Sequence, residues 1–502
     1  MISAVEVFLW GTRIGVLYER NSSYYFQYDR SFLNSGIELS PFKMPLSDNV
    51  YTFPDLKNVQ AFRGLPGLLA DSLPDNFGNA VIEQWLISQN RNPDSFSPIE
   101  RLCYTGTRGM GGLEYVPSIG PSVMNTSVDV DAIAEFAMKV LEAKGNLELK
   151  LEDSTIAQLI EVGSSVGGAK AKATLAWNRN TGEIKSGQID AGDGFDYWIF
   201  KFDGGKGYSQ IEFAYYLMAQ DLDINMQECL LIEMEGGYHF ATKRFDRVNN
   251  QKVHTQTLGA LTHLDYNTPN CCSYEYYGAC AKKLNCGKSD IEQIFRRMVF
   301  SVMGMNNDDH VKNFSFLMDR RGTWSVSPAY DICYAYKENN PWIKQHQMSI
   351  NGKSTLITEQ DLIACGKSFG LSADFCKRVI EQTTLVVSKW LEYADKSKVQ
   401  EEKAIQIQDN LKTEPYRELY SVGGKQPDDH IINDEVKLLF SASVSGYDAN
   451  RYDHAIVIYD KDNDEVFRTE DPEELSNIVD EEDLKEYLKS YCHDIKTRDD
   501  PR

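Results

Sequence analysis

The stretch from residue 304 to residue 331 constrains this chain most, because its polar residues lie between two apolar segments. Asp308 and Asn313 are five positions apart, and Asp331 follows at the end of the second apolar segment. An Asp-x-x-x-x-Asn interval is typical of the catalytic loop of phosphoryl-transfer enzymes, where the Asp orients or deprotonates a hydroxyl and the Asn holds magnesium. Such loops are followed by a second metal-binding acid, and Asp331 has the expected position. The stretch therefore predicts a phosphoryl-transfer site with Asp308 as its catalytic residue.

The same stretch allows a rival interpretation, in which Asp308, Asp309 and His310 are the metal ligands of a hydrolase. We disfavour this hypothesis because the sequence offers no second cluster of His and Asp residues. It would also leave a glycine-rich segment and a strand lysine, both described below, without a role. For His310 we expect a structural role in orienting the loop backbone rather than proton transfer.

Composition narrows the class of protein further. The chain has 502 residues, of which 42% are hydrophobic and 25% charged, so we expect a globular protein of about two to four domains. The net charge of -22 argues against binding to nucleic acid by this chain alone. No apolar run approaches the roughly 20 residues of a membrane span, and the first residues do not resemble a signal peptide. The ten cysteines match no zinc framework. We therefore expect a cytoplasmic protein with reduced thiols.

The first 120 residues predict a separate subdomain. Residues 1–55 form short alternating runs joined by turns, which is typical of a small antiparallel sheet. Helical spacing follows between residues 62 and 89, with an amphipathic helix over 76–88, and Leu113 to Val116 reads as another strand. Residues 118–130 are rich in Ser, Pro and Asn and predict a linker.

Residues 131–245 predict a mixed lobe. Helices are expected over 131–144 and 155–162, strands over 195–202, 224–234 and 238–247, and a helix over 210–222. The glycine-rich segment from Gly163 to Trp177 suits either a phosphate-binding loop or a plain hairpin turn. Lys201 shares a strand face with Tyr197 and Ile199 and needs a partner, for which Glu212 is suitable; otherwise it is a solvent-reaching edge lysine.

Residues 246–412 predict a helical lobe that contains the opening stretch. Helices are expected over 270–303, 359–363, 373–393 and 396–412. Residues 413–430 form a second candidate linker, and residues 430–502 predict an acidic α+β extension with strands over 436–444 and 454–459 and a helix over 482–491.

The order of these features favours one architecture. A glycine loop, a strand lysine, a helix glutamate, a hinge strand and the acidic loop follow one another as phosphoryl transfer on two lobes requires. We therefore predict an α+β protein with an N-terminal antiparallel-sheet subdomain (1–120), a kinase-like N-lobe (131–245), a helical C-lobe (246–412) and the acidic extension (430–502). ATP and Mg²⁺ are the cofactors that this arrangement implies.

The residues from Asn307 to Ser315, followed by Ser327 to Asp331, resemble the signature of the HipA family of serine/threonine kinase toxins from bacterial toxin–antitoxin modules. The strands from Trp10 to Leu17 and the segment from Gly64 to Asn79 also resemble that family's N-terminal subdomain. The resemblance covers roughly residues 1–410, and its motifs are highly specific in combination.

The resemblance implies roles residue by residue. Asp308 would be the catalytic aspartate, Asn313 and Asp331 would bind magnesium, and Glu212 would hold Lys201. Ser165, or alternatively Ser164, would be autophosphorylated, and the added charge would expel the glycine loop by repulsion. The implied ATP-binding residues, with 243–245 as the adenine hinge and Asp246 near the ribose, are Val166, Gly167, Gly168, Ala169, Lys170, Lys172, Lys201, Lys243, Arg244, Phe245, Asp246, His310, Asn313, Tyr330 and Asp331.

The resemblance also implies partners. Family substrates include aminoacyl-tRNA synthetases, and family members pair with a helix-turn-helix antitoxin, which must be a separate protein because no such pattern is evident here. Ala171 departs from the family, which often has proline there, and the acidic extension has no counterpart. Two alternatives stay open: a catalytically silent scaffold that bridges an antitoxin to DNA, and an effector kinase exported without a cleaved signal.

Overall fold

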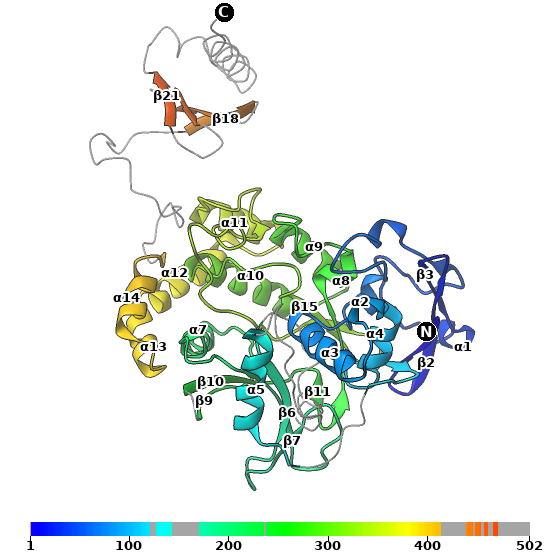
Figure 1. Cartoon of the computed structure of the whole chain (residues 1–502). Coiled ribbons are helices and arrows are strands. Elements are labelled where there is room, and N and C mark those ends of the chain that lie inside the picture. Colours follow the sequence, from blue (N-terminus) through cyan, green and yellow to red (C-terminus); the bar gives the residue numbers. More distant parts are fainter. Residues whose placement is uncertain are drawn as a thin grey trace, which may run out of the picture. The chain divides into compact units, whose positions relative to one another are not determined.

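The computed structural model describes residues 2–120, 127–142, 170–234 and 237–412, together with four strands between 438 and 469. The chain divides into two compact units, Met1–Gly423 and Gly424–Arg502. The fold is mixed α+β, as the sequence predicts (Figure 1). Within the described residues no helix is long and apolar enough to cross a membrane.

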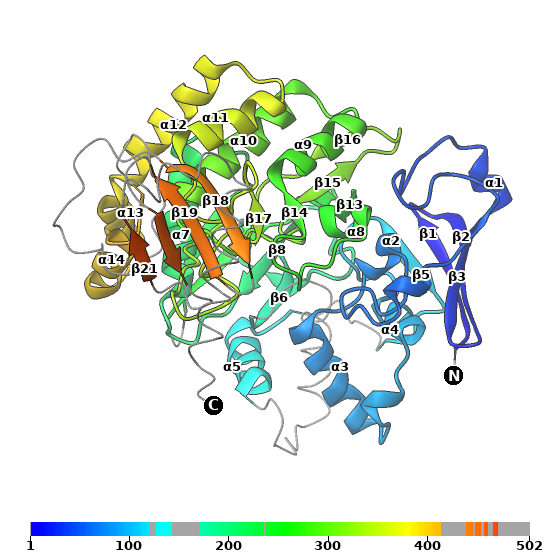
Figure 2. The same ribbon diagram turned by 90° about the horizontal axis from the view of Figure 1, so that it is seen from above.

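The first unit begins with a five-stranded antiparallel sheet of order β4-β3-β2-β1-β5, which confirms the predicted N-terminal sheet. Alternation buries Val5, Val7 and Leu9 on one face of β1, and Gly11 at φ +81° forms the turn into β2. In both views, helices α2 to α4 lie between this sheet and the rest of the unit (Figures 1 and 2). The elements are β1 (Ala4–Leu9), β2 (Thr12–Arg20), β3 (Ser23–Tyr28), α1 (Arg30–Leu33), β4 (Val50–Tyr51), α2 (Gly67–Ala70), α3 (Asn76–Ser88), α4 (Pro98–Thr105) and β5 (Leu113–Val116).

A second five-stranded antiparallel sheet has the order β7-β6-β8-β10-β9. On β8, Trp198 and Phe200 point into an apolar cluster with Phe77 and Val81 of α3 and Ile133 of α5. Alternation then turns the opposite face of β8, which carries Lys201, away from that cluster. The elements are α5 (Val130–Glu142), β6 (Lys172–Trp177), β7 (Ile184–Ser186), β8 (Asp196–Lys201), α7 (Tyr208–Asp221), β9 (Cys229–Met234) and β10 (Gly237–Lys243).

The remainder of the first unit is largely helical, with a three-stranded sheet β13-β15-β16 whose last two strands lie within residues 304–331. Two predicted helices are each divided. Asn285 at φ +59° and the N-cap Gly287 separate α9 from α10, and Ser388 and Lys389 separate α12 from α13. The elements are β11 (Arg247–Val248), β12 (Gln251–Lys252), β13 (His254–Thr257), α8 (Leu258–Thr262), β14 (Cys272–Ser273), α9 (Tyr274–Lys283), α10 (Lys288–Met303), β15 (Ser315–Met318), β16 (Trp324–Val326), β17 (Met348–Ser349), α11 (Glu359–Ser368), α12 (Ala373–Val387), α13 (Trp390–Lys396) and α14 (Glu401–Gln408).

Hydrogen bonds tie the N-terminal residues to the segment that follows β10. The Trp10 indole donates to the carbonyl of Lys252 (2.8 Å), and the amide of Gly67 donates to Nε2 of His263 (2.9 Å). The buried Asp71 carboxylate accepts from the amide (2.7 Å) and hydroxyl (2.8 Å) of Thr257. The N-terminal residues are therefore held firmly against the middle of the chain.

The second unit contains an antiparallel sheet of order β18-β19-β20-β21. Its first and third strands match the two predicted strands, whereas the other two were not predicted. The helices predicted over 155–162 and 482–491, the linker over 413–430 and most of the linker over 118–130 lie outside the described residues. The strands are β18 (Leu438–Val444), β19 (Tyr447–Tyr452), β20 (Ile456–Tyr459) and β21 (Glu465–Thr469).

Candidate active site

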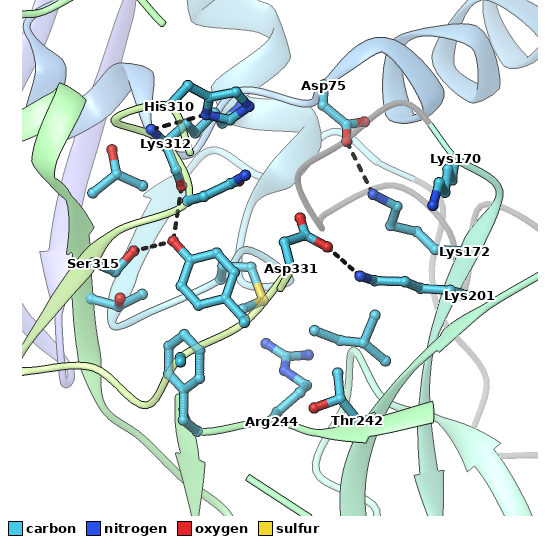
Figure 3. Close-up of a pocket in the computed structure, with 18 of the residues that line it drawn as sticks. Asp75, Lys170, Lys172, Lys201, Thr242, Arg244, His310, Lys312, Ser315 and Asp331 are labelled. Atoms are coloured by element: carbon cyan, nitrogen blue, oxygen red, sulfur yellow. Dashed lines mark hydrogen bonds and ion pairs between the residues drawn. The ribbon is translucent and has the colours of Figure 1, made fainter. Parts of the chain in front are cut away.

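A cavity of about 400 Å³ lies where the N-terminal residues, the second sheet and the stretch from residue 304 to residue 331 meet (Figure 3). This volume is within the range of small-molecule sites. Six predicted site residues, Ser164, Ser165, Val166, Gly167, Gly168 and Ala169, lie outside the described residues. The predicted residues that line the cavity are Lys170, Lys172, Lys201, Glu212, Lys243, Arg244, Phe245, Asp308, His310, Asn313, Tyr330 and Asp331.

Strand register places two lysines at one wall. Lys172 on β6 and Lys201 on β8 are paired across the antiparallel ladder, so their side chains share a face of the sheet. Lys201 contacts the carboxylates of Glu212 on α7 and of Asp331. Burial alone would lower the pKa of Lys201, but the two carboxylates outweigh it and hold this pKa above its ordinary value. Lys201 is therefore a fixed cation inside the cavity.

Asp331 has a backbone conformation that few residues adopt. Its φ of +54° lies in the left-handed region, which Asp tolerates better than most side chains but at a cost of about 1–3 kcal/mol. Burial would raise the pKa of its carboxyl, whereas Lys201 and then Lys172 lower it well below its usual range. The result is an ionised carboxylate that faces the lysines, as Figure 3 shows.

Residues 308–313 form a loop that is closed by its own hydrogen bonds. Nδ2 of Asn313 donates to the carbonyl of Asp308 (2.8 Å), and the amide of Lys312 donates to Nδ1 of His310 (3.3 Å). The second of these bonds agrees with the structural role expected for His310. The side chain of Asp308 is half exposed at the cavity, with Nε2 of His310 3.8 Å away. Burial, followed by the charges of Asp331 and Asp309, raises the pKa of Asp308 to about 7.

Asp309 points away from Asp308 and anchors the loop from the protein interior. Its buried carboxylate accepts from the amide of Gln347 (2.7 Å) and from the hydroxyl of Tyr274 (3.0 Å), and it lies 2.9 Å from Nδ1 of His346. Within the described ranges, no group of three or more His, Cys, Asp or Glu side chains is placed to hold a metal ion. The hydrolase interpretation, which required Asp309 as a metal ligand beside Asp308, does not fit these contacts.

An aromatic pair forms the side of the cavity next to β10. The rings of Phe245 and Tyr330 lie 5.6 Å apart, and the Tyr330 hydroxyl donates to the carbonyl of Lys312 (2.8 Å). Nζ of Lys243 pairs with Asp196 at the strand edge (2.8 Å). This side offers flat apolar surface beside the backbone of the segment that follows β10.

The structure contradicts the expectation that Asp246 lies near a ribose. Asp246 is fully buried and does not line the cavity. It accepts from Nε (2.9 Å) and Nη2 (2.8 Å) of Arg244, from Nη1 of Arg247 (2.6 Å) and from the amide of Gly111 (2.8 Å). Both carboxylate oxygens are thus engaged by two guanidinium groups, which makes Asp246 a structural ion-pair residue.

Sequence reasoning missed the contribution of the N-terminal subdomain. Side chains that line the cavity from this region include Leu68, Asp71, Leu73 and Asp75, none of which had been assigned to the site. Lys312 also lines it, with Nζ 5.1 Å from the centre of the Tyr266 ring. The position of Asp75 before an amphipathic helix signalled an N-cap, and nothing in the local sequence pointed to a cavity.

Comparison with known families matches two parts of the chain. The HipA N-terminal domain family matches residues 5–116, and the HipA-like C-terminal domain family matches residues 164–390. The kinase candidate Y4dM of Sinorhizobium fredii (strain NBRC 101917 / NGR234) is 29% identical over 153 residues, which are 27% of this chain. The chain spans 36% of the length of this curated relative.

Solved structures support the fold. The HipA protein of Shewanella oneidensis MR-1, solved with HipB and its operator DNA, matches with a TM-score of 0.57 at 17% identity, over 81% of this chain and 94% of that one. At this identity the match concerns the fold alone. The Helicobacter pylori proinflammatory kinase CtkA gives a TM-score of 0.25 at 14% identity, over 42% of this chain and 92% of its own, which is too low to carry an argument.

Proposed function

We propose that this chain, which belongs to the HipA family, is an ATP- and Mg²⁺-dependent kinase that phosphorylates a serine or threonine of another protein. The observation that carries the proposal is the meeting of Lys201, Glu212 and Asp331 in the cavity that Asp308 and Asn313 also line. In this proposal the chain consists of the N-terminal subdomain 1–120, two kinase-like lobes at residues 131–245 and 246–412, and the extension 430–502.

The residues present fit a magnesium–nucleotide complex. Five lysines line the cavity, among them Lys170, Lys172 and Lys201, and ammonium groups bind phosphate as point charges. The Asp331 carboxylate and the Asn313 amide oxygen are hard oxygen donors of the kind that Mg²⁺ prefers. When bound, Mg²⁺-ATP supplies the phosphoryl group and neutralises charge as it is transferred. The flat surface beside Phe245 and Tyr330 suits an adenine ring.

The chain's own residues would position the reacting groups. Asp308 would accept a hydrogen bond, and then the proton, from the acceptor hydroxyl, and its position at the cavity suits that contact. Lys201, held between Glu212 and Asp331, would present a fixed cation to the phosphates. The Asn313–Asp308 hydrogen bond and the His310–Lys312 hydrogen bond would keep the loop in its working conformation.

We extend the proposal to regulation and partners on the strength of the family resemblance. Autophosphorylation at Ser165, or at Ser164, would add up to two negative charges beside the phosphate site and drive the glycine loop out. The substrate would be a cytoplasmic protein, with aminoacyl-tRNA synthetases as the first candidates. A separate helix-turn-helix antitoxin would be the partner, and DNA contact by this acidic chain alone is not expected.

The test is incubation of the purified chain with radiolabelled ATP, Mg²⁺ and a bacterial lysate. We expect labelling of the chain or of a lysate protein, and Asp308→Asn and Asp331→Asn should each lower it by about 100-fold or more. Asp193→Asn, which removes an exposed carboxylate outside the cavity, is the matched control and should leave labelling unchanged. Full labelling by both site variants would refute these roles. A wild-type chain that neither binds nor hydrolyses ATP would favour the silent scaffold instead.

A further inference from the structure

Asp75 belongs to the N-terminal subdomain and has two contacts of different kinds. It is the N-cap of α3, where Oδ1 accepts from the amide of Gly78 (2.8 Å). The other oxygen lies 3.7 Å from Nζ of Lys172, and it makes no hydrogen bond within the part of the chain that the structure describes. The side chains of Asp75 and Lys172 are only 5% and 4% exposed. Figure 3 shows the two groups facing each other, joined by a dashed line, at one side of the cavity.

Lys172 lies among like charges. Its cross-strand neighbour is Lys201, and the charge of Lys312 also opposes its protonation. Burial lowers the pKa of Lys172, and these two cations lower it further, whereas Asp75 and then Asp331 raise it. Since Asp331 already contacts Lys201, Asp75 is the carboxylate that serves Lys172 most directly.

We propose that Asp75 is a positioning residue of the nucleotide site, which holds Lys172 as a cation directed at the phosphates. The N-terminal subdomain thereby completes a phosphate site that residues 170–331 otherwise build. This inference rests on the proposed function and adds to it a residue from outside the kinase-like lobes. It makes the first 120 residues part of the catalytic apparatus and not an appended module.

Packing fixes Asp75 in place, as a positioning role requires. Phe77 and Val81, on the first turns of the same helix, belong to the apolar cluster that contains Trp198 and Phe200 of β8. Four residues before Asp75, the carboxylate of Asp71 is bonded twice to Thr257. The helix that Asp75 caps is therefore attached to the same sheet that carries Lys172 and Lys201, so the distance between Asp75 and Lys172 is set by rigid elements.

The substitution Asp75→Asn separates the two roles of this side chain. Asparagine caps helices about as well as aspartate, so α3 and the free energy of unfolding should be preserved while the charge beside Lys172 is lost. Calorimetric titration of the full chain with ATP and Mg²⁺ should give an affinity about tenfold weaker than that of the wild type, as expected for one charge-assisted contact. Adenosine, which has no phosphates, should bind both proteins equally.

Two further variants test whether Asp75 acts through Lys172. Lys172→Met should weaken ATP binding, and Asp75→Asn should cause no additional loss in that background, because the partner is already gone. Asp29→Asn changes another N-cap of the same subdomain, where the carboxylate accepts from Ser31 (2.9 Å) away from the cavity, and should leave ATP affinity unchanged.

The outcomes divide clearly. Equal or tighter ATP binding by Asp75→Asn, an additive loss with Lys172→Met, or equal weakening of adenosine and ATP would each overturn the positioning role while leaving the kinase proposal intact. A wild-type chain that does not bind ATP would overturn the proposed function and this inference together.

Discussion

Replacing Asp246 by asparagine should destabilise the protein strongly without acting on a nucleotide directly. The carboxylate and the Arg244 side chain are fully buried, and Arg247 is 6% exposed. Removing one member of a buried ion-pair network costs about 3–5 kcal/mol, because the remaining charges stay in the protein interior without compensation. The substituted amide would keep one acceptor oxygen for two guanidinium groups. We therefore expect the free energy of unfolding to fall by an amount within that range at neutral pH.

The assay is urea unfolding of the full chain, followed by tryptophan fluorescence over a range of pH. Burial would raise the pKa of Asp246, but Arg244 and Arg247 outweigh it and hold this pKa well below its usual range. The carboxylate therefore contributes stability that is fully present above the unfolded value of about 3.9 and is lost as pH falls through the folded value. The difference between wild type and variant should be constant from about pH 8 to about pH 5 and should shrink in stronger acid.

Asp196→Asn is the matched control. Asp196 pairs with Lys243 in the same sheet, but this pair is exposed (44% and 31%), so its loss should cost less than about 1 kcal/mol. A stable Asp246→Asn protein whose only defect is weaker ATP binding would refute our reasoning and restore the ribose-binding role first expected for this residue.

Three further predictions follow from single sites. Lys201→Met should lower phosphorylation by about 100-fold or more in the radiolabelling assay, because it removes the cation that Glu212 holds toward the phosphates. An unchanged rate would contradict the role proposed for Lys201. His254 is buried with both ring nitrogens unbonded within the described residues, and burial lowers its pKa to about 4. His254→Phe should raise the free energy of unfolding by about 1 kcal/mol at pH 7. The variant should also lack the loss of stability that the wild type undergoes as pH falls from about 6.5 toward 4, as measured by urea unfolding. Ser97→Ala removes the capping box with Glu100 and should cost about 1 kcal/mol, whereas Ser97→Thr should cost little; equal losses would disprove capping.

Local sequence patterns predicted most helices and strands of the first unit. The periodicity over 76–88 matches α3 residue for residue, because an aspartate N-cap and an uninterrupted apolar face define this helix completely. The division of residues 270–303 was missed, although Gly287 offered a signal, because apolar spacing continues on both sides of the turn. The spacing of Asp308, Asn313 and Asp331 predicted side chains that do line one cavity, while their chemical roles stay predictions.

The rest of the site depends on contacts that no local pattern encodes. Asp75 meets Lys172 across 97 positions of sequence, and the rigid packing of α3 on the second sheet brings them together. Asp246 shows the reverse error, since family resemblance suggested a ligand role. The arginines at 244 and 247 on either side of it are the signal in the sequence that favours a buried ion-pair network.

The hydrogen bonds between the first residues and the middle of the chain bear on the order in which the protein folds during its synthesis. The Trp10 indole meets a carbonyl 242 positions later, and the Trp324 indole meets the carbonyl of Glu38 286 positions earlier. Contacts that close such long loops form late, since their entropic cost precedes any gain. On a ribosome, the leading sheet would wait for its docking surface until residue 324 had emerged. Asp331 of the proposed nucleotide site follows seven positions later, so in this proposal the sheet and the site would be completed at nearly the same point of synthesis.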